Sequence, residues 1–446
     1  MNKNFLEDIL KKLKKSGADQ ADVIFSCFEH KSSSCRLGKL EKTESSKTSE
    51  IGIRVIVKKK QSIISSTNLE QKNIDYLIEK VLEMAKVVPK DEYCGLADES
   101  QIYKPNQSEI NSLELFDPYE PDIKDINEKV LSLEGSALSN SKISNSEGAE
   151  LSFSKNNSIL MASNGLISEI NKTHSDYIVA VLAGKNNSME RAYDYKSKVF
   201  FEELGDFEKV GKKVAKEVIR KLDSRKIKTR KCDVVYDSKI SSSLLSNLFN
   251  ASNAASIIKG TSFLKTKKNK KIFNSKINII DNPSMKKGLR SKIIDSEGIQ
   301  ATPKKLIEDG SLNFYFNCLS SARQLKEMPS GHGSRSTNST PSASYTNLYL
   351  EKGDVKKNDL IKSIKKGVLV TELMGSSINY SNGDYSRGAS GFWIENGKLS
   401  YPVSEITIGG NLKEIFQHMV PADDLQFNFG INSPSILIKN LTVGGI

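Results

Sequence analysis

The spacing of apolar residues changes within the first 90 positions, and this change constrains the fold more than any other feature of the chain. Ile51, Ile53, Val55 and Val57 occupy every second position, which is typical of a strand with one buried face. Residues 74–85 then carry apolar side chains every three or four positions, which indicates an amphipathic helix. A strand followed by a helix that can cover it predicts a unit of α/β structure.

Similar patterns occur elsewhere in the first half of the chain. Residues 5–13 predict an amphipathic helix with lysines on its outer face, and residues 21–29 predict another strand. Residues 158–170 form two apolar runs around Asn164 and Gly165, which predicts a hairpin closed by a type I′ turn. Strands and helices are therefore mixed throughout this half.

Polar, proline-bearing and basic segments divide the chain into regions. We expect two small α/β units, over residues 1–95 and 122–224, joined by a linker over residues 96–121. The basic segment 225–231 marks the next boundary, and residues 232–446 form the third region. A chain of 446 residues is too long for one ordinary core, so several domains are expected.

The third region carries the signals of a larger, mainly β domain. Asp309-Gly310 and Asn396-Gly397 each separate two apolar segments, and such dipeptides favour two-residue hairpin turns. Two helices are predicted within this domain and end just before glycines, as helices often do, over residues 238–258 with Gly260 and 359–366 with Gly367. The whole chain is therefore predicted to be an α+β protein.

Composition excludes several classes of protein. No apolar stretch reaches the roughly 18 residues that a membrane helix requires, and the amphipathic N-terminal segment lacks the apolar run of an export signal. The five cysteines are odd in number and form no CxxC pair, which predicts neither a disulfide framework nor a zinc knuckle. These features predict a cytoplasmic protein that does not bind membranes.

The net charge of +12 raises the question of a polyanionic partner. The densest basic runs, residues 58–60 and 265–271, lack the interleaved aromatic residues of a base-stacking surface. Lysines are scattered over most of the predicted surfaces. We therefore interpret the charge as a solvated basic surface and do not expect a nucleic-acid partner.

The chain shows no local motif for hydrolysis. Its four histidines are isolated from one another, so zinc would need dispersed ligands such as His332, His418 and Cys318. No GxSxG elbow occurs, and Ser390 is interpreted as structural. Residues 329–345, which include His332, are interpreted as a mobile polar loop and not as a phosphate-binding loop, because no Walker Lys-Ser/Thr follows.

One segment carries a family resemblance. Residues 382–397, NGDYSRGASGFWIENG, resemble the C-terminal signature of the TldE/PmbA branch of the TldD/TldE peptidase family. Residues 401–408 and 410–412 are similar to the strand and helix that follow in that branch, and residues 320–323, SSAR, are similar to an upstream segment. The resemblance spans nearly the whole chain, with its specific motifs in the last third.

The resemblance implies a heterodimeric zinc metallopeptidase that degrades or processes unfolded peptides. In such a pair the TldD-type subunit holds zinc through an HExxxH helix, and the matching helix here is predicted over residues 238–258. Leu245, Ser246 and Asn250 fall near the metal-binding positions, and none of them can replace an imidazole or a general base. The resemblance therefore implies a subunit without catalytic, cofactor or metal residues, and zinc in a TldD-type partner.

The resemblance also suggests where a peptide or partner would be contacted. Asp384, Arg387 and Glu405 are the polar candidates for a peptide cleft, and Trp393 is a candidate for the core or the subunit interface. An exposed strand edge could hold an extended peptide. A homodimer is possible when the partner is missing, since both subunits share a fold. The alternatives are a self-sufficient metallopeptidase with dispersed ligands and a regulatory binding protein, since the family has also been labelled a modulator of DNA gyrase.

Overall fold

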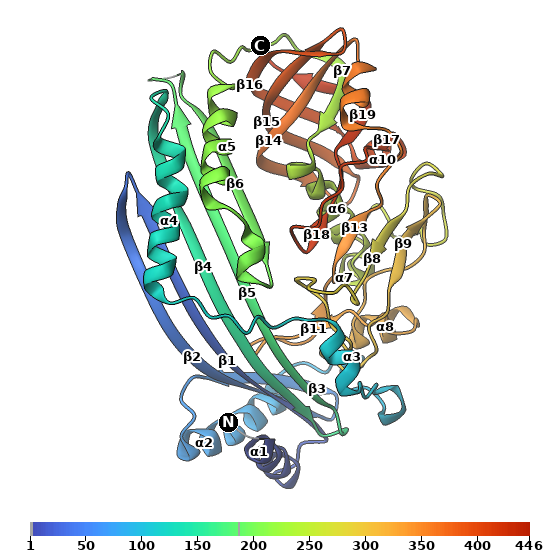
Figure 1. The fold of residues 1–446 in the computed structure, drawn as a ribbon. Helices are drawn as coiled ribbons and strands as arrows, with labels where there is room; N and C mark the ends of the chain where they lie inside the picture. The colour runs from blue at the N-terminus through green and yellow to red at the C-terminus, as the bar shows by residue number, and fades with distance from the viewer. Residues whose placement is uncertain (1–2, 186–187) are drawn as a thin grey trace.

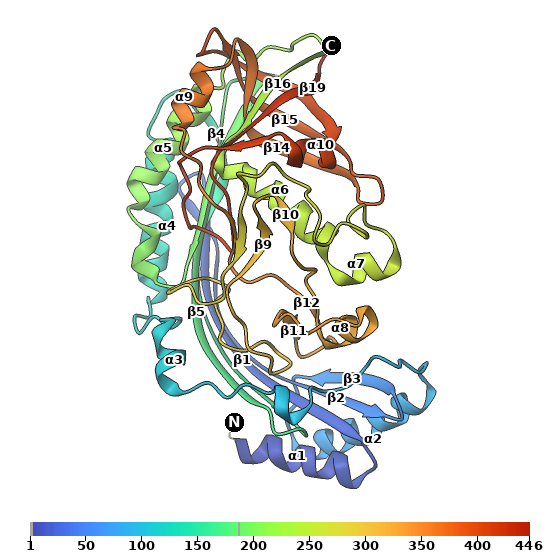
Figure 2. The same cartoon turned by 90° about the vertical axis from the view of Figure 1, so that its right-hand side faces the viewer.

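The computed structural model describes residues 3–185 and 188–446. The fold is mixed α+β, as expected: a long, curved antiparallel sheet formed by the N-terminal half faces a β-rich C-terminal region that includes a small barrel (Figures 1 and 2). None of the described helices combines the length and the apolar character needed to cross a membrane.

The N-terminal sheet has six strands in the order β3-β2-β1-β4-β5-β6. Its strands are β1 (Gln20–Arg36), β2 (Lys39–Val57), β3 (Lys60–Ser66), β4 (Ile143–Ala162), β5 (Ile167–Ala183) and β6 (Glu190–Lys198). We expected two small α/β units in succession, but β1 pairs with β4 from Asp22 opposite Ala162 to Cys35 opposite Ala149. Strands from the two expected units therefore share one sheet.

Four helices cover a single face of this sheet in two separate cores. They are α1 (Lys3–Lys15), α2 (Gln71–Val87), α4 (Ile123–Leu138) and α5 (Phe207–Ile219). Val23 and Phe25 of β1 pack with α1 and α2, whereas Leu151 and Phe153 of β4 pack with α4 and α5. Alternate residues of a strand point to the same face, so both cores lie on the convex side that Figure 2 shows.

The opposite, concave face of the sheet packs against the C-terminal region. Ile24 and Leu160 lie on this face and form a small apolar cluster with Ile294. The connecting segments between the sheet and its helices contain short helical turns, η1 (Glu99–Gln101), α3 (Gln107–Ser112) and η3 (Phe201–Leu204). The two halves of the molecule are therefore joined by side chains on the concave face of the sheet, which the helices do not cover.

The C-terminal region contains a sheet ordered β16-β15-β14-β7-β19-β17, which closes into a barrel because β16 also pairs with β19. The strands are β7 (Arg230–Tyr236), β14 (Lys366–Asn379), β15 (Asp384–Glu395), β16 (Lys398–Asn411), β17 (Met419–Pro421) and β19 (Ile436–Gly444). Helix α10 (Leu412–Gln417) follows β16, and α9 (Lys357–Lys362) precedes β14. Closure leaves most barrel strands with hydrogen-bonded neighbours on both sides.

A second sheet, ordered β10-β9-β8-β13-β18, lies beside the barrel. It consists of β8 (Ile279–Asp281), β9 (Lys304–Glu308), β10 (Ser311–Leu312), β13 (Leu348–Leu350) and β18 (Ile431–Asn432), and β11 (Gly333–Ser334) with β12 (Ser342–Ala343) form a separate pair. The helices of this part are α6 (Ser238–Ser252), α7 (Ala254–Lys259) and α8 (Leu319–Leu325). One hydrophobic core, which includes Leu244 and Leu248 of α6, joins both sheets.

The predicted hairpin turns are partly confirmed. Asp309 and Gly310 have φ values of 46° and 82°, and Asn396 and Gly397 have values of 49° and 75°, as a type I′ turn requires. The hairpin between β4 and β5 is present, but the predicted type I′ turn is wrong. Only Gly165 of its two central residues has a positive φ, 88°.

Both predicted C-terminal helices differ from expectation. The helix over residues 238–258 is broken at Asn253, whose extended backbone ends α6 and begins α7, although Gly260 does end α7 at a φ of 73°. Gly367 does not end a helix, because α9 stops at Lys362 and Gly367 already belongs to β14. A Cβ at Gly367 would lie 2.4 Å from the Asp233 carbonyl oxygen, so the close approach of β7 requires glycine there.

Candidate functional site

Helix α6 is the element on which the resemblance places the metal ligands. Asp237 caps its first turn by accepting a hydrogen bond from the Lys239 amide at 3.0 Å. Its apolar side is buried against both C-terminal sheets, whereas Asn250 on the last turn is exposed. Its sequence therefore makes α6 a buried scaffold with one accessible end.

Neutral polar groups gather at that end of α6. The Tyr380 hydroxyl, just after β14, donates to Asn247 Oδ1 at 3.0 Å and accepts from Asn250 Nδ2 at 3.0 Å. Asn247 Nδ2 is buried without a hydrogen-bond partner among the described residues, as is Ser243 Oγ one turn earlier on the helix. This end of α6 can therefore offer hydrogen bonds but no charge.

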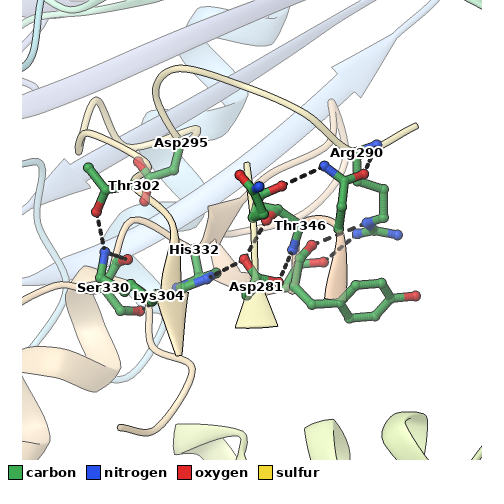
Figure 3. A network of polar contacts seen from close by, with 12 residues as sticks. Asp281, Arg290, Asp295, Thr302, Lys304, Ser330, His332 and Thr346 are labelled. Carbon is green, nitrogen blue, oxygen red and sulfur yellow. Dashed lines mark hydrogen bonds and ion pairs between the residues drawn. The ribbon is translucent and has the colours of Figure 1, made fainter. Parts of the chain in front are cut away.

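A buried polar network surrounds His332 (Figure 3). Its Nε2 lies 3.0 Å from Asp281 Oδ2 and its Nδ1 lies 2.8 Å from Ser330 Oγ. Burial alone would raise the pKa of Asp281, but His332 and the donors of Thr346 outweigh it and lower that pKa. The Ser330 hydroxyl also bonds the Asn317 carbonyl at 3.1 Å, and all three side chains are buried, so this Ser-His-Asp set stabilises the fold.

The interpretation of residues 329–345 as a mobile loop is wrong. Arg335 is buried and forms an ion pair with Asp22 of β1 at 2.5 Å, although without hydrogen-bond alignment. A Cβ at Gly52 of β2 would lie only 1.9 Å from the Thr337 carbonyl oxygen. Buried charge and close backbone packing therefore hold this segment against the concave face of the sheet.

Two carboxyls lie beneath this segment. A Cβ added at Gly333 would lie 2.5 Å from Glu297 Oε2 and 2.9 Å from Asp295 Oδ2. Burial raises the pKa of both groups, and that of Glu297 reaches about 8 because the charge of Asp295 adds to the effect. Nothing in the sequence singles out either residue, since each looks like an ordinary surface acid.

The four candidates for contact with a peptide or partner occupy different surroundings. Asp384 accepts from Asn411 Nδ2 at 3.1 Å at the start of β15, and Arg387 is half-buried. Trp393 is 3% exposed inside the barrel core, and nine residues of strand, roughly 30 Å, separate it from Asp384. Glu405 is exposed and pairs with Lys226 at 2.7 Å. The structure thus does not bring the four into one site.

Comparison with known proteins decides the family. A family model described as the PmbA/TldA metallopeptidase C-terminal domain matches residues 229–445, and the models for domain 1 and the central domain match residues 21–85 and 116–222. The metalloprotease PmbA homolog of Buchnera aphidicola (Acyrthosiphon pisum) is 31% identical over 91% of this chain and 89% of its own length. The chain belongs to the PmbA/TldD metallopeptidase family.

Other members agree in sequence and fold. Metalloprotease PmbA of Escherichia coli O157:H7 is 30% identical over 96% of this chain and 93% of its own length. A protein of Bacteroides thetaiotaomicron described as a candidate modulator of DNA gyrase has a TM-score of 0.90 at 27% identity, over 100% of this chain and 99% of its own. TldE of Thermococcus kodakarensis shares the fold, with a TM-score of 0.87 at 20% identity, over 98% and 99% of the two chains.

The residues on α6 do not fit the metal that the PmbA/TldD family name implies. Leu245 is 1% exposed within the hydrophobic core, Ser246 Oγ donates to the Ser242 carbonyl at 3.3 Å, and Asn250 bonds Tyr380. A core leucine, a serine hydroxyl and an amide do not form the donor set of a peptidase zinc site.

The dispersed ligands considered from the sequence are not brought together either. His332 bonds Asp281 and Ser330, whereas His418 Nδ1 faces the Glu414 carbonyl at the end of α10. Across residues 3–185 and 188–446, no three His, Cys, Asp or Glu side chains are grouped so that they could hold a metal ion. His332, His418 and Cys318 are therefore not one site in this structure.

Proposed function

We propose that this chain is the non-catalytic, TldE/PmbA-type subunit of a heterodimeric zinc metallopeptidase that degrades or processes unfolded peptides. A TldD-type partner carries the zinc and the hydrolytic step. The observation that supports this division is the donor set of α6, in which Leu245, Ser246 and Asn250 stand where an HExxxH helix needs two imidazoles and a carboxylate. The role of the chain is then to bind and enclose the peptide.

An open strand edge supports peptide binding. Strand β2 runs from Lys39 to Val57, but β3 pairs only with Ile51–Val57. Among the described strands, only β1 pairs with residues 39–50, which leaves their other edge open. An extended peptide can add to such an edge through main-chain hydrogen bonds that do not depend on its sequence.

Asp384, Arg387 and Glu405 remain our candidates for contact with the partner or the peptide. Asp384 and Glu405 are exposed on the barrel surface. Arg387 is half-buried, and its Nε has no hydrogen-bond acceptor among the described residues, which is uncommon for a buried charged group. Trp393 contributes from inside the barrel, where it supports Tyr401.

The test compares the isolated chain, the isolated TldD-type partner and their equimolar mixture. We expect stoichiometric zinc in the partner and in the mixture but not in this chain, and cleavage of an unfolded peptide by the mixture. A mixture in which the glutamate of the partner's motif is replaced by glutamine is the matched control and should bind peptide without cutting it. Tightly bound zinc and cleavage by this chain alone would overturn the assignment in favour of a self-sufficient peptidase.

A regulatory binding protein is the second candidate, because one relative is described as a candidate modulator of DNA gyrase. Lys209, Lys212, Lys213 and Lys216 of α5 line one surface depression, although the first three also form ion pairs with nearby acids. DNA affinity that falls steeply with salt, and that greatly exceeds the affinity of a protein of equal net charge, would favour this candidate. If the two proteins bind DNA with equal affinity, the lysines form only a solvated surface.

A further inference from the structure

Three cationic side chains meet where β5 touches the C-terminal region. Lys172 of β5 reaches across the junction and its Nζ donates to the Ser291 carbonyl at 2.5 Å. Arg290 and Lys292 flank Ser291 in sequence, and both act electrostatically on Lys172. All three residues keep part of their surface exposed. The junction therefore places three basic side chains around one short backbone segment.

These three side chains form no ion pair with a carboxylate of the described residues. Of the described residues, none forms an ion pair with Lys172, Arg290 or Lys292, although lysines and arginines elsewhere in the chain form many. Lys292 Nζ reaches only the Gly333 carbonyl at 3.4 Å, while Asp295, Asp281 and Glu297 act on it from farther away. No acidic group compensates Lys172, and burial together with Lys292 and Arg290 lowers its pKa to about 7.

The position of the cluster suits a ligand. Lys172 lies five positions before Tyr177 in β5, with no bulge between them, so the two side chains point to opposite faces of the sheet. Tyr177 packs in the core that α4 and α5 form on the convex face. Lys172 therefore projects from the concave face, away from both helical cores. The strand that carries it also carries Ile170 and Ile178 on the same face, both of them exposed. An extended ligand lying along β5 would meet apolar surface on either side of the charges.

Arg290 is held in place independently of any ligand (Figure 3). Its guanidinium lies 4.2 Å from the centre of the Tyr345 ring and donates to the Tyr345 carbonyl at 3.1 Å and to Ser344 Oγ at 2.6 Å. Tyr345 in turn packs edge-on against Phe249 of α6, with ring centres 4.9 Å apart. The cluster is thus connected through one aromatic contact to the helix that carries metal ligands in the TldD-type subunit.

Recessed cations are normally paired, because removing a charge from water without a counter-ion is unfavourable. We propose that Lys172, Arg290 and Lys292 form a subsite that binds a carboxylate of the peptide. This inference rests on the proposed function and specifies its substrate chemistry. The carboxylate is either the C-terminus of the peptide or an acidic side chain, since both present the same two oxygens to the cations.

The experiment measures the binding of three short, N-terminally labelled peptides to the reconstituted pair by fluorescence anisotropy. The first has a free C-terminal carboxylate and no acidic side chain, the second is its C-terminal amide, and the third is the amide with one internal glutamate. Tighter binding of the first than the second identifies the terminal carboxylate. Tighter binding of the third than the second identifies an acidic side chain.

The decisive variant is Lys172→Met, which removes the charge and keeps the length of the side chain. We expect this variant to lower the affinity for the carboxylate-bearing peptide roughly tenfold or more, because a charge-assisted hydrogen bond is lost. The affinity for the amide without an acidic side chain should not change. Lys142→Met, which removes the same charge from an exposed position just before β4, should change neither affinity. An equal loss for all three peptides would overturn the subsite, since it would show a general role in folding or assembly.

The outcomes separate this inference from the proposed function. Equal binding of all three peptides by the unaltered pair overturns the subsite and leaves the peptide-binding subunit standing. A pair that binds none of them contradicts the proposed function and the subsite together.

A second measurement needs no variant. At neutral pH a lysine with a pKa of about 7 reacts with acetic anhydride faster than ordinary lysines, because more of it is neutral. Mass spectrometry of the full chain should show that the free-acid peptide slows acetylation of Lys172 and that the amide does not. Equal protection by both peptides, or by neither, would contradict carboxylate binding at Lys172.

Discussion

The two faces of the N-terminal sheet are built from the same long strands but carry different chemistry. On the convex face, Phe153 and its neighbours are almost fully buried beneath α4 and α5. On the concave face the same strands carry Asp22, Lys172 and the 43% exposed Phe28. A side-chain period of two lets one strand stabilise the fold on one side and present charges on the other. The two large helical cores and the buried charges are therefore separated by face and not by region of the sequence.

The largest effect should come from emptying the convex core. Phe153→Ala removes a side chain that is 1% exposed, so we expect a loss of about 3–5 kcal/mol in the free energy of unfolding. Phe28→Ala deletes the same group from the concave face and should cost less than about 1 kcal/mol. Urea denaturation followed by circular dichroism measures both. Similar losses for the two variants would break the distinction between the faces.

The concave face also contains one buried ion network that should matter for stability. Asp22→Asn leaves the buried guanidiniums of Arg54 and Arg335 without their counter-ion, so we expect a loss of about 3 kcal/mol. The control is Glu29→Gln on the same strand, which breaks a largely exposed pair with Lys47 and should cost less than about 1 kcal/mol. If the two variants denature at the same urea concentration, the concave face contributes only surface charge.

A pH dependence should arise where the C-terminal region covers the concave face. The pKa of Glu297 is raised to about 8, so the folded state holds a proton that the unfolded state releases near its ordinary value. Stability should therefore fall as the pH rises from about 4.5 to about 8. Glu297→Gln should reduce this fall in urea unfolding measured across the range, and the remainder comes from Asp295, whose pKa burial also raises.

The control for that prediction is Glu308→Gln. Glu308 is exposed and its pKa is lowered by Lys305, so its titration lies below this pH range. We expect this variant to retain the full fall in stability. If stability no longer decreases with rising pH in either variant, the pH dependence belongs to other groups.

The smallest effect is expected at the exposed end of α6, away from both faces of the sheet. Tyr380→Phe deletes the hydroxyl between Asn247 and Asn250, so we expect a loss of about 1 kcal/mol. Tyr76→Phe on the exposed side of α2 should stay within about 0.5 kcal/mol of the unaltered chain. Thermal unfolding of both variants measures the difference. A loss as large as that of Asp22→Asn would show that this neutral cluster contributes as much as buried charge.

Local elements could be predicted because their signals are short-range. The helix over residues 74–85 and the turns at Asp309-Gly310 and Asn396-Gly397 follow from side-chain period and backbone preference. The pairing of β1 with β4 could not be predicted, since residues 22–35 and 149–162 are distant in sequence and many strands share the same apolar pattern. The family could be recognised because residues 382–397 form a specific motif.

Part of the candidate site could likewise be predicted from the sequence, and part could not. The absence of histidine and carboxylate from α6 is visible in the residues themselves. The segment over residues 329–345 looked mobile because it is rich in small polar residues, but Arg335 and His332 have buried partners far away in the sequence. Lys172 had no distinguishing neighbour at all.

By itself, the sequence determined several local elements, the family and the chemistry that α6 can offer, because each depends on residue identity within a short window. The tertiary structure decided that strands of both N-terminal units share one sheet and that Lys172 meets Arg290 and Lys292. The physical reason is that electrostatic energy and burial depend on distances in space, and folding brings together charges that lie about 120 residues apart in the chain.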